Sequence, residues 1–404
     1  MPSPEVVTNY NDSDGVDLGK KLISKDYLIS VYPQIADQLI TPELWIWGYN
    51  TYGGLGTNDT TTRSTPVTTL AGGSNWKQVS SGGYQTAAIK TDGTLWTWGY
   101  NPQGQLGIND TTDRSTPVTT FAGGTNWKQV SASTYRTAAI KTDGTLWVWG
   151  FNGSGELGTN DLTQRNTPVT TFAGGSNWKQ VSSGDYFTAA IKTDGTLWTW
   201  GYNSNGRLGT NDTTTRATPV TTFAGGTNWK QVDCGYGTTA AIKTDGTLWT
   251  WGRNYAGSLG TNDGATRCTP VTTFAGGTNW KQVVTGDYFT AAIKTDGTLW
   301  TWGYNGNGEL GINGGGNRST PVITFAGGTN WKQVDAGTLH TAAIKTDGTL
   351  WTWGYNSEGQ LGTNDTTSRL TPVTTLAGGS NWKQVSSGGY QTAAIKTSDD
   401  LIGI

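Results

Sequence analysis

Residues that support nucleophilic catalysis or metal binding are scarce in this chain of 404 residues. It has one histidine, His340, and two cysteines, Cys234 and Cys268, that lie apart in the sequence. A catalytic triad needs a histidine base beside its nucleophile, and a zinc site needs clustered cysteine and histidine ligands. Neither pattern occurs, and no glycine-rich phosphate loop links a strand to a helix. We therefore predict no catalytic residue, no metal and no cofactor, and His340 is interpreted as a packing or rim histidine.

Carboxylates could support a different chemistry, the hydrolysis of a glycosidic bond between two of them. The carboxylates outside the regular pattern of the chain are Glu156, Asp185, Asp233, Asp287, Glu309, Asp335 and Glu358. No two of them are close in sequence, so we predict that the protein is not an enzyme. Asn58, Asp59 and Arg63 recur together in six units, and we interpret this set as bracing a loop rather than binding calcium, which needs more clustered oxygen ligands.

The elements that must position these groups come from a repeat of 51 residues. Trp47 returns once per period up to Trp353, and all 21 tryptophans follow the same period. Each unit holds four strand-like runs, and Asp-Gly pairs such as Asp92-Gly93 predict a tight hairpin with positive φ at both central residues. Seven such units predict an all-β fold, a seven-bladed β-propeller of four-stranded antiparallel blades.

The ends of the repeat block fit a closed ring. The block starts in mid-unit at Leu44 and stops after Lys396, so a composite blade built from both termini would close the circle. We predict an N-terminal arm over residues 1–43, the propeller over 44–397 and a C-terminal tail over 398–404. The run that contains proline, Thr116–Phe121, is expected to be the outermost strand, because proline cannot donate a hydrogen bond to an inner ladder.

The segment Trp98–Gly107 reads Trp-Gly-Tyr-Asn-Pro-Gln-Gly-Gln-Leu-Gly and resembles the signature of the regulator of chromosome condensation repeat family. This resemblance covers Leu44–Thr397 and implies a seven-bladed propeller. Blades of the family usually carry Gly-x-x-His-Thr, which only Gly337–Thr341 keeps here. The founding member is a nucleotide exchange factor for a small GTPase and binds chromatin. Nothing in this chain resembles its basic tail or its wedge insertion, so the resemblance implies the fold without that function.

Differences between the units gather in two loops, one after Trp-Gly and one before Thr-Ala-Ala. Antiparallel pairing of the strands that carry them places both loops at one end of each blade, where tyrosine-rich variable loops are typical of binding surfaces. Drift at unconstrained positions is the alternative explanation. The predicted binding-face residues are Tyr52, Tyr84, Gln85, Tyr135, Arg136, Glu156, Asp185, Tyr186, Phe187, Arg207, Tyr236, Arg253, Tyr255, Asp287, Tyr288, Phe289, Glu309, His340, Glu358, Tyr390 and Gln391.

The leader, residues 1–43, differs in composition from the repeats and contains no tryptophan. Asp17–Gly19 and Lys25–Pro33 resemble leaders of tailed-bacteriophage structural proteins. We interpret the leader as a short helix or extended arm that docks on another protein, with a plug against the repeats as the alternative. The predicted docking residues are Tyr27, Leu28, Val31, Tyr32 and Ile35.

The first functional hypothesis is a non-enzymatic phage virion protein, made in the host cytoplasm without a signal peptide. Its leader would bind other virion proteins, and its variable loops would bind a host-surface protein or glycan. The alternatives are a carbohydrate-binding propeller and a cytoplasmic scaffold or GTPase regulator. The net charge of −2 and the even spacing of the lysines and arginines argue against a nucleic-acid partner. We expect no membrane insertion, and a homo-oligomer is left open.

Overall fold

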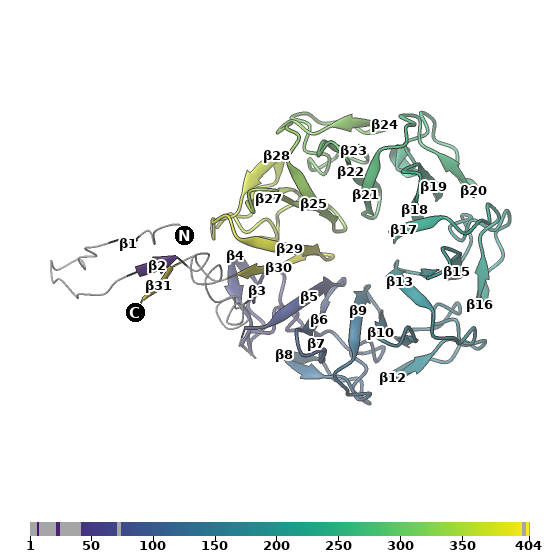
Figure 1. The fold of residues 1–404 in the computed structure, drawn as a ribbon, viewed down its shortest axis with the longest axis horizontal. Coiled ribbons are helices and arrows are strands. Elements are labelled where there is room, and N and C mark those ends of the chain that lie inside the picture. The colour runs from purple at the N-terminus through teal and green to yellow at the C-terminus, as the bar shows by residue number, and fades with distance from the viewer. Residues whose placement is uncertain (1–5, 8–21, 25–41, 71–73, 398–400, 404) are drawn as a thin grey trace.

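The computed structural model describes residues 6–7, 22–24, 42–70, 74–397 and 401–403, and most of these form a ring of seven four-stranded antiparallel sheets (Figure 1). The first blade after the N-terminal half-blade contains β5 (Trp76–Ser81), β6 (Gln85–Lys90), β7 (Leu95–Gly99) and β8 (Arg114–Thr119). The next five blades repeat these bounds: β9 (Trp127–Ala132), β10 (Arg136–Lys141), β11 (Leu146–Gly150), β12 (Arg165–Thr170); β13 (Trp178–Ser183), β14 (Phe187–Lys192), β15 (Leu197–Gly201), β16 (Arg216–Thr221); β17 (Trp229–Cys234), β18 (Thr238–Lys243), β19 (Leu248–Gly252), β20 (Arg267–Thr272); β21 (Trp280–Thr285), β22 (Phe289–Lys294), β23 (Leu299–Gly303), β24 (Arg318–Ile323); β25 (Trp331–Ala336), β26 (His340–Lys345), β27 (Leu350–Gly354) and β28 (Arg369–Thr374).

The seventh blade joins the two ends of the repeat block, as the sequence predicted. Its inner strands are β29 (Trp382–Ser387) and β30 (Gln391–Thr397), and its outer strands are β3 (Pro42–Gly48) and β4 (Arg63–Thr68). The β3–β30 ladder runs over seven residue pairs, from Pro42–Thr397 to Gly48–Gln391. Backbone hydrogen bonds between the first and last repeats therefore close the ring.

In each blade the strand that contains Thr-Pro-Val is the outermost, which confirms that prediction. β8 carries Pro117 at the rim of the ring, whereas β5 lies nearest the axis (Figure 1). A 3-10 turn, η2 (Tyr255–Gly257), is the one helical element in the described part of the chain.

The Asp-Gly hairpins form, but their turn differs from the predicted one. Only Gly93 has a positive φ, of 81°, and its N–H donates to the carbonyl of Lys90 at 2.9 Å. The loop is therefore a type I turn followed by a left-handed glycine, a three-residue hairpin loop. Asp92 instead accepts hydrogen bonds from the N–H and hydroxyl of Thr94 at 2.9 and 2.7 Å, and these bonds hold its pKa below the usual range.

The hydrophobic core consists of layers between neighbouring blades. Trp98 and Trp76 are buried and lie tilted against each other with ring centroids 6.1 Å apart. The indole N–H of Trp98 donates to the carbonyl of Gly54 in the preceding blade at 2.9 Å. Burial of such large rings supplies several kcal/mol per blade, and the buried indole keeps a hydrogen-bond partner.

A ring of seven glutamines links the inner strands around the axis. Gln78 donates from Nε2 to the carbonyl of Val130 at 3.1 Å, and its Oε1 accepts from the N–H of Val130 at 3.1 Å. Gln384 makes the same two bonds to Val79 at 3.0 Å each, across the closure of the ring. The ring members are Gln78, Gln129, Gln180, Gln231, Gln282, Gln333 and Gln384. Each blade is thereby tied to the next with both amide groups satisfied.

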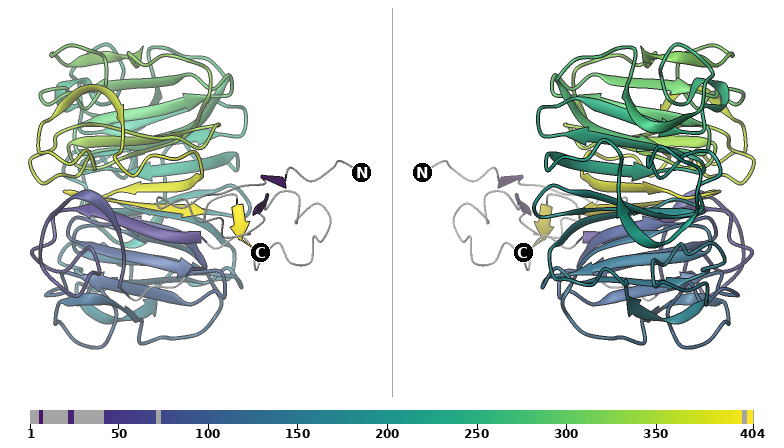
Figure 2. Two further views of the ribbon diagram at one scale, coloured as in Figure 1. Left: turned by 90° about the vertical axis from the view of Figure 1, so that its left-hand side faces the viewer. Right: turned by 90° about the vertical axis from the view of Figure 1, so that its right-hand side faces the viewer.

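Short strands from both termini form a separate three-stranded antiparallel sheet. β2 (Leu22–Ser24) pairs with β1 (Val6–Val7) on one side and with β31 (Leu401–Gly403) on the other. The predicted docking residues of the leader, Tyr27 to Ile35, lie outside the described residues. Figure 2 shows the propeller from its edge, with its two faces on opposite sides. In the part of the chain that is described, no helix has the length and apolar character needed to cross a membrane.

Candidate functional site

The two variable loops of each blade are hydrogen-bonded to each other at one end of the ring, which we call the aromatic face. The N–H of Tyr100, which follows β7, donates to the carbonyl of Tyr84, which precedes β6, at 3.1 Å. Equivalent bonds recur around the ring, including Tyr202 to Tyr186 and Tyr355 to Leu339, both at 2.9 Å. The fold therefore displays both loops of every blade together, opposite the Asp-Gly turns.

Aromatic side chains form a belt on this face that consists of three separate clusters: one around Tyr84, the pair of Tyr135 and Phe151, and one around Tyr288. The aromatic belt comprises Tyr49, Tyr52, Tyr84, Tyr100, Tyr135, Phe151, Tyr186, Tyr202, Tyr236, Tyr255, Tyr288, Tyr304, Tyr355 and Tyr390. It contains every tyrosine between residues 42 and 397. The rings of Tyr84 and Tyr390 stack at 6.0 Å across two blades, and those of Tyr52 and Tyr100 lie 4.5 Å apart. The rings within each cluster are thus packed side by side before any partner binds.

Nearly half of the belt was missed by sequence reasoning, which searched for positions that differ between units. Tyr49, Tyr100, Tyr202, Tyr304 and Tyr355 sit at an almost constant position in Trp-Gly-Tyr-Asn, with Phe151 as their counterpart. The strand register places this position beside the variable loop of the same blade. An aromatic residue directly after a Trp-Gly strand end was the available signal.

Six of the predicted binding residues are instead buried between blades. These are the first residues of the second strands: Gln85, Arg136, Phe187, Phe289, His340 and Gln391. Gln85 donates to the carbonyls of Ser133 and Arg136 in the next blade at 3.0 and 3.1 Å. His340 pairs with Thr392 of the next blade at 2.8 Å, and burial lowers its pKa to about 3. These side chains tie blades together and leave the accessible surface to other residues; the interpretation of His340 as a packing residue agrees with this position.

Three further candidates, Glu156, Arg207 and Glu309, are also buried, within the loops that follow the third strands. Glu156 accepts from the N–H of Ser154 at 2.8 Å, and Arg207 donates to the carbonyl of Tyr236 at 2.9 Å. Burial raises the pKa of Glu309. They act as loop supports beneath the aromatic belt.

The remaining candidates are at least partly exposed on the aromatic face. They are Tyr52, Tyr84, Tyr135, Asp185, Tyr186, Tyr236, Arg253, Tyr255, Asp287, Tyr288, Glu358 and Tyr390. Arg253 lies over the rings of Tyr255 and Tyr288, 5.2 and 5.5 Å from their centroids. Tyr84 is held among neighbouring tyrosines, and burial raises its pKa to about 12. Tyr84 therefore stays neutral at physiological pH, and the rings of Tyr255 and Tyr288 already accommodate a cation on their faces.

A narrow polar channel opens at the centre of this face. Asp185 and Asp287 line its mouth, and Asp233 and Asp335 line a cavity of about 120 Å³ deeper along the axis. Asp335 accepts from the N–H of Ser387 at 2.6 Å, yet burial raises its pKa to about 7. Burial raises the pKa of Asp287 well above its ordinary value, and the negative charge of the nearby Asp185 raises it further. The sequence offered no sign that these four carboxylates, spread over 150 residues, meet on one axis.

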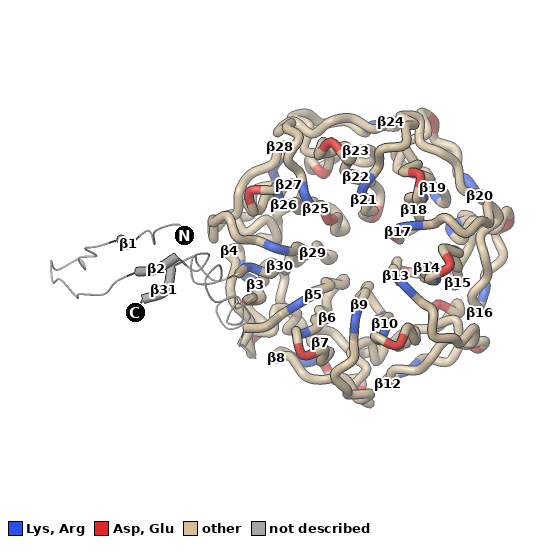
Figure 3. The backbone as a smooth tube through the Cα atoms, in the orientation of Figure 1, with Lys and Arg blue, Asp and Glu red and all other residues tan. Residues whose placement is uncertain are grey.

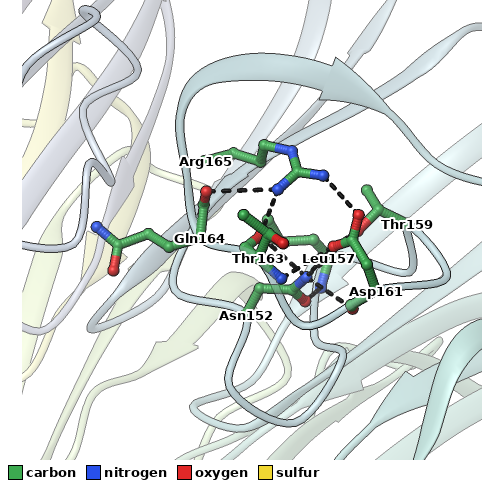
Figure 4. Close-up of polar contacts among 7 residues, drawn as sticks. All are labelled: Asn152, Leu157, Thr159, Asp161, Thr163, Gln164 and Arg165. Atoms are coloured by element: carbon green, nitrogen blue, oxygen red, sulfur yellow. Dashed lines mark hydrogen bonds and ion pairs between the residues drawn. The ribbon is translucent and has the colours of Figure 1, made fainter.

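The aspartate and arginine of the predicted set form an ion pair in the loop at the rim. The asparagine of the set, Asn160, has a positive φ of 64°, and its N–H donates to the carbonyl of Ala217 in the next blade at 2.9 Å. An asparagine outside the predicted set, Asn152, braces the same loop. Figure 4 shows one copy, in which Arg165 binds Asp161 at 2.6 Å. Asn152 donates from Nδ2 to the carbonyls of Asp161 and Thr163 at 2.9 and 3.2 Å, and its Oδ1 accepts from the N–H of Leu157 at 2.9 Å. Across the residues that the structure describes, no three His, Cys, Asp or Glu side chains are placed to hold a metal ion.

Comparison with known proteins identifies the family. The model of the RCC1-like domain matches residues 43–394. The chain is 31% identical over 334 residues to the ultraviolet-B receptor UVR8 of Arabidopsis thaliana, covering 81% of this chain and 76% of UVR8. It is 30% identical over 364 residues to human HERC2, an E3 ubiquitin-protein ligase, covering 87% of this chain but 8% of HERC2. The structure of Prp20p from Saccharomyces cerevisiae superposes with a TM-score of 0.77 at 19% identity, covering 89% of this chain and 92% of Prp20p.

These relatives correct the functional hypothesis. UVR8 and HERC2 are proteins of plants and mammals, so the prediction of a bacteriophage virion protein located on the particle is wrong. The virion partners predicted for the leader and the loops lose their support with it. The phage resemblance rested on Asp17–Gly19 and Lys25–Pro33, which lie outside the described residues, whereas the family evidence covers the propeller. The Trp-Gly-x-Asn signature, the seven closed blades and the match over residues 43–394 together show that this chain belongs to the RCC1-like domain family.

Proposed function

We propose that this protein is a non-catalytic scaffold or regulator that binds another protein through its aromatic face. The observation that carries the proposal is the aromatic belt, which gathers all thirteen tyrosines of residues 42–397 around one opening of the ring. Tyrosine is enriched in protein interfaces and at their energetic hot spots, because it offers a large contact area together with a hydrogen-bonding group.

The mutual packing of the belt favours binding. Tyr84 touches Tyr49, Tyr52, Tyr100 and Tyr390, with ring centroids 5.6 to 6.0 Å away. Side chains already held by neighbours lose little rotamer freedom on association, so more of the contact energy appears as affinity.

The charges of the aromatic face define the expected partner surface. The face and the channel hold seven carboxylates (Glu156, Asp185, Asp233, Asp287, Glu309, Asp335 and Glu358) and three arginines (Arg136, Arg207 and Arg253). Their net charge is −4 when all are ionised and less negative at neutral pH, because burial raises the pKa of Asp233, Asp287, Glu309 and Asp335. A partner segment with lysine or arginine would contact the tyrosines by cation–π interactions and the carboxylates at the channel mouth by ion pairs.

Family membership agrees with a binding role. Prp20p, which shares the fold, binds Gsp1p and histones, and yeast RCC1 has been crystallised with Kap60. Those partners are properties of the yeast protein. For this chain they support the general role of a propeller that binds proteins.

The proposal is tested by affinity capture from the cells that express the chain, with matched surface variants. The test variant carries Tyr84→Ser, Tyr186→Ser and Tyr288→Ser, and the control carries Lys128→Ser, Lys230→Ser and Lys332→Ser on the opposite face. We expect the wild-type and control chains to capture the same proteins in the same amounts. The tyrosine variant should capture at least tenfold less of each. Equal capture by all three chains, each with an unchanged melting temperature, would contradict the proposal.

A further inference from the structure

The face that carries the Asp-Gly turns, which we call the basic face, displays a circle of large apolar side chains. It consists of Leu70, Phe121, Phe172, Phe223, Phe274, Phe325 and Leu376, each 60 to 66% exposed. Each residue opens the loop that leads from an outer strand to the next inner strand. That loop packs on an Asp-Gly turn: the N–H of Trp127 donates to the carbonyl of Gly93 at 3.0 Å, and the N–H of Thr142 to the carbonyl of Asn126 at 2.8 Å. Phe121 follows the outermost strand β8 by two residues, and its N–H donates to the carbonyl of Gly107 at 2.9 Å, so the circle lies along the outer edge of the ring at this end.

Lysines surround the axis on the same face. The second residue of each inner strand is an exposed lysine, which gives Lys77, Lys128, Lys179, Lys230, Lys281, Lys332 and Lys383 (Figure 3). Their neighbours, of which Lys90 is one, are held over tryptophan rings, with Nζ 4.9 Å from the ring of Trp76. In the described parts of the chain, all six ion pairs join arginine to aspartate at the rim, so none involves these lysines.

The basic face has a strong net charge. Over residues 42–397 it carries fourteen lysines, opposed by six turn aspartates of the Asp92 type and by Glu43, which leaves a net charge of +7. Even spacing along the sequence had suggested evenly distributed charge. The fold instead places both lysines of every repeat at one end and the irregular carboxylates at the other.

From this combination we propose that the basic face docks on an anionic lipid bilayer. Apolar side chains that enter the headgroup region and lysines that meet anionic lipids are the two signals that together hold a protein on a membrane surface. Equivalent residues of a sevenfold ring lie in one plane, and a bilayer, being flat and laterally uniform, is able to meet several of them at once, away from the blade where the chain enters at Pro42 and leaves at Thr397. A protein partner would need seven matching apolar pockets on one circle. This docking is peripheral and does not depend on the function proposed for the aromatic face.

The experiment is flotation of the full chain with vesicles of phosphatidylcholine alone or with 30% phosphatidylserine. We expect binding to the vesicles that contain phosphatidylserine and weakened binding as salt rises, because the Debye length shortens. A variant with Phe121→Ser, Phe172→Ser, Phe223→Ser, Phe274→Ser and Phe325→Ser should bind at least tenfold more weakly. The control with Tyr84→Ser, Tyr186→Ser and Tyr288→Ser should bind like the wild type.

The phenylalanine side chains are exposed, so their replacement leaves the fold intact, and the melting temperature of each variant verifies this. A second variant, with Lys77, Lys128, Lys179, Lys230 and Lys281 changed to Gln, should lose the preference for phosphatidylserine. Absence of flotation, or equal flotation of the phenylalanine variant, would overturn the proposal. Binding to a DNA duplex that exceeds vesicle binding and survives loss of the phenylalanines would also overturn it, by showing a polyanion site without apolar contact.

Discussion

The two faces of this propeller differ although the same seven units build both. The aromatic face presents loops that differ between units, a packed tyrosine belt and a channel with four aspartates. The basic face presents nearly identical turns, exposed phenylalanines that stand apart from the core and an excess of lysine. This contrast underlies the two proposals, in which the varied end meets a shaped protein partner and the constant end meets a laterally uniform bilayer.

The largest effect is expected from a substitution in the tryptophan core, which supports both faces. Trp200 is buried between blades and donates to the carbonyl of Glu156 at 2.8 Å. Trp200→Ala should lower the free energy of unfolding by about 3–5 kcal/mol, because it opens a cavity and removes one of the two hydrogen bonds to that carbonyl, which also accepts from the hydroxyl of Thr188. Denaturant unfolding measures the loss. Phe172→Ala, at an exposed position, is the control and should change stability by less than about 0.5 kcal/mol; equal losses would contradict the layered core.

The next effect concerns the channel of the aromatic face and depends on pH. The pKa of Asp335 is about 7 in the fold against an ordinary 3.8, so the folded chain holds this proton more tightly than the unfolded chain. Stability from this group is therefore full below about pH 4 and is lost as pH rises toward 7, by up to about 4 kcal/mol before screening by channel water. Asp335→Asn should remove this slope from the unfolding free energy measured between pH 4 and pH 8. An unchanged slope would contradict the placement of Asp335 in a poorly solvated channel.

A smaller effect is expected at Arg136, where a substitution tests whether this side chain stabilises the fold or is free to bind a partner. Arg136 donates to the carbonyls of Asp185 and Phe187 in the next blade, at 2.8 and 2.6 Å, and also to Gly184. Arg136→Ala should cost about 1–3 kcal/mol because buried carbonyls lose their donor. Arg136→Gln should recover part of this loss, since Gln85 and Gln391 fill the equivalent place. Thermal melts compare the three chains, and a fully stable alanine variant would show that the side chain is free to bind a partner instead.

The smallest effect lies at the rim of the aromatic face, in the loop between β11 and β12. The pair of Arg165 and Asp161 is partly exposed, and one blade holds Asn313-Gly314 in place of the Asn-Asp pair. Asp161→Asn should cost no more than about 0.5–1 kcal/mol. A double-mutant cycle with Arg165→Gln isolates the coupling, and a coupling of several kcal/mol would mean that the loop brace contributes to ring closure.

The sequence predicts the propeller because the period, the hairpin signals and the split unit are each local and repeat seven times. It does not predict the turn type at Asp92-Gly93, where two turn geometries accept the same residues and the hydrogen bonds of Thr94 decide between them. The repeat pattern also does not reveal which side chains point into the neighbouring blade. Variation marked Gln85 and Arg136 as candidates, although the strand register turns them into the next blade.

Positions that hardly differ between units were overlooked for the opposite reason. The positions of Tyr100 and Lys128 hold nearly the same residue in every unit, and the symmetry of the ring places the copies of each in a circle on one face. Asp233 and Asp335 lie two units apart and meet only because inner strands converge on the axis.

The central claim is that the aromatic face, and not the basic face, binds protein. A benzophenone amino acid placed at Tyr288 or at Phe172 of the full chain, followed by irradiation in the cells that express it, tests this claim directly. We predict discrete protein adducts from position 288 and none from position 172. Protein adducts from position 172, or none from position 288, would contradict the account.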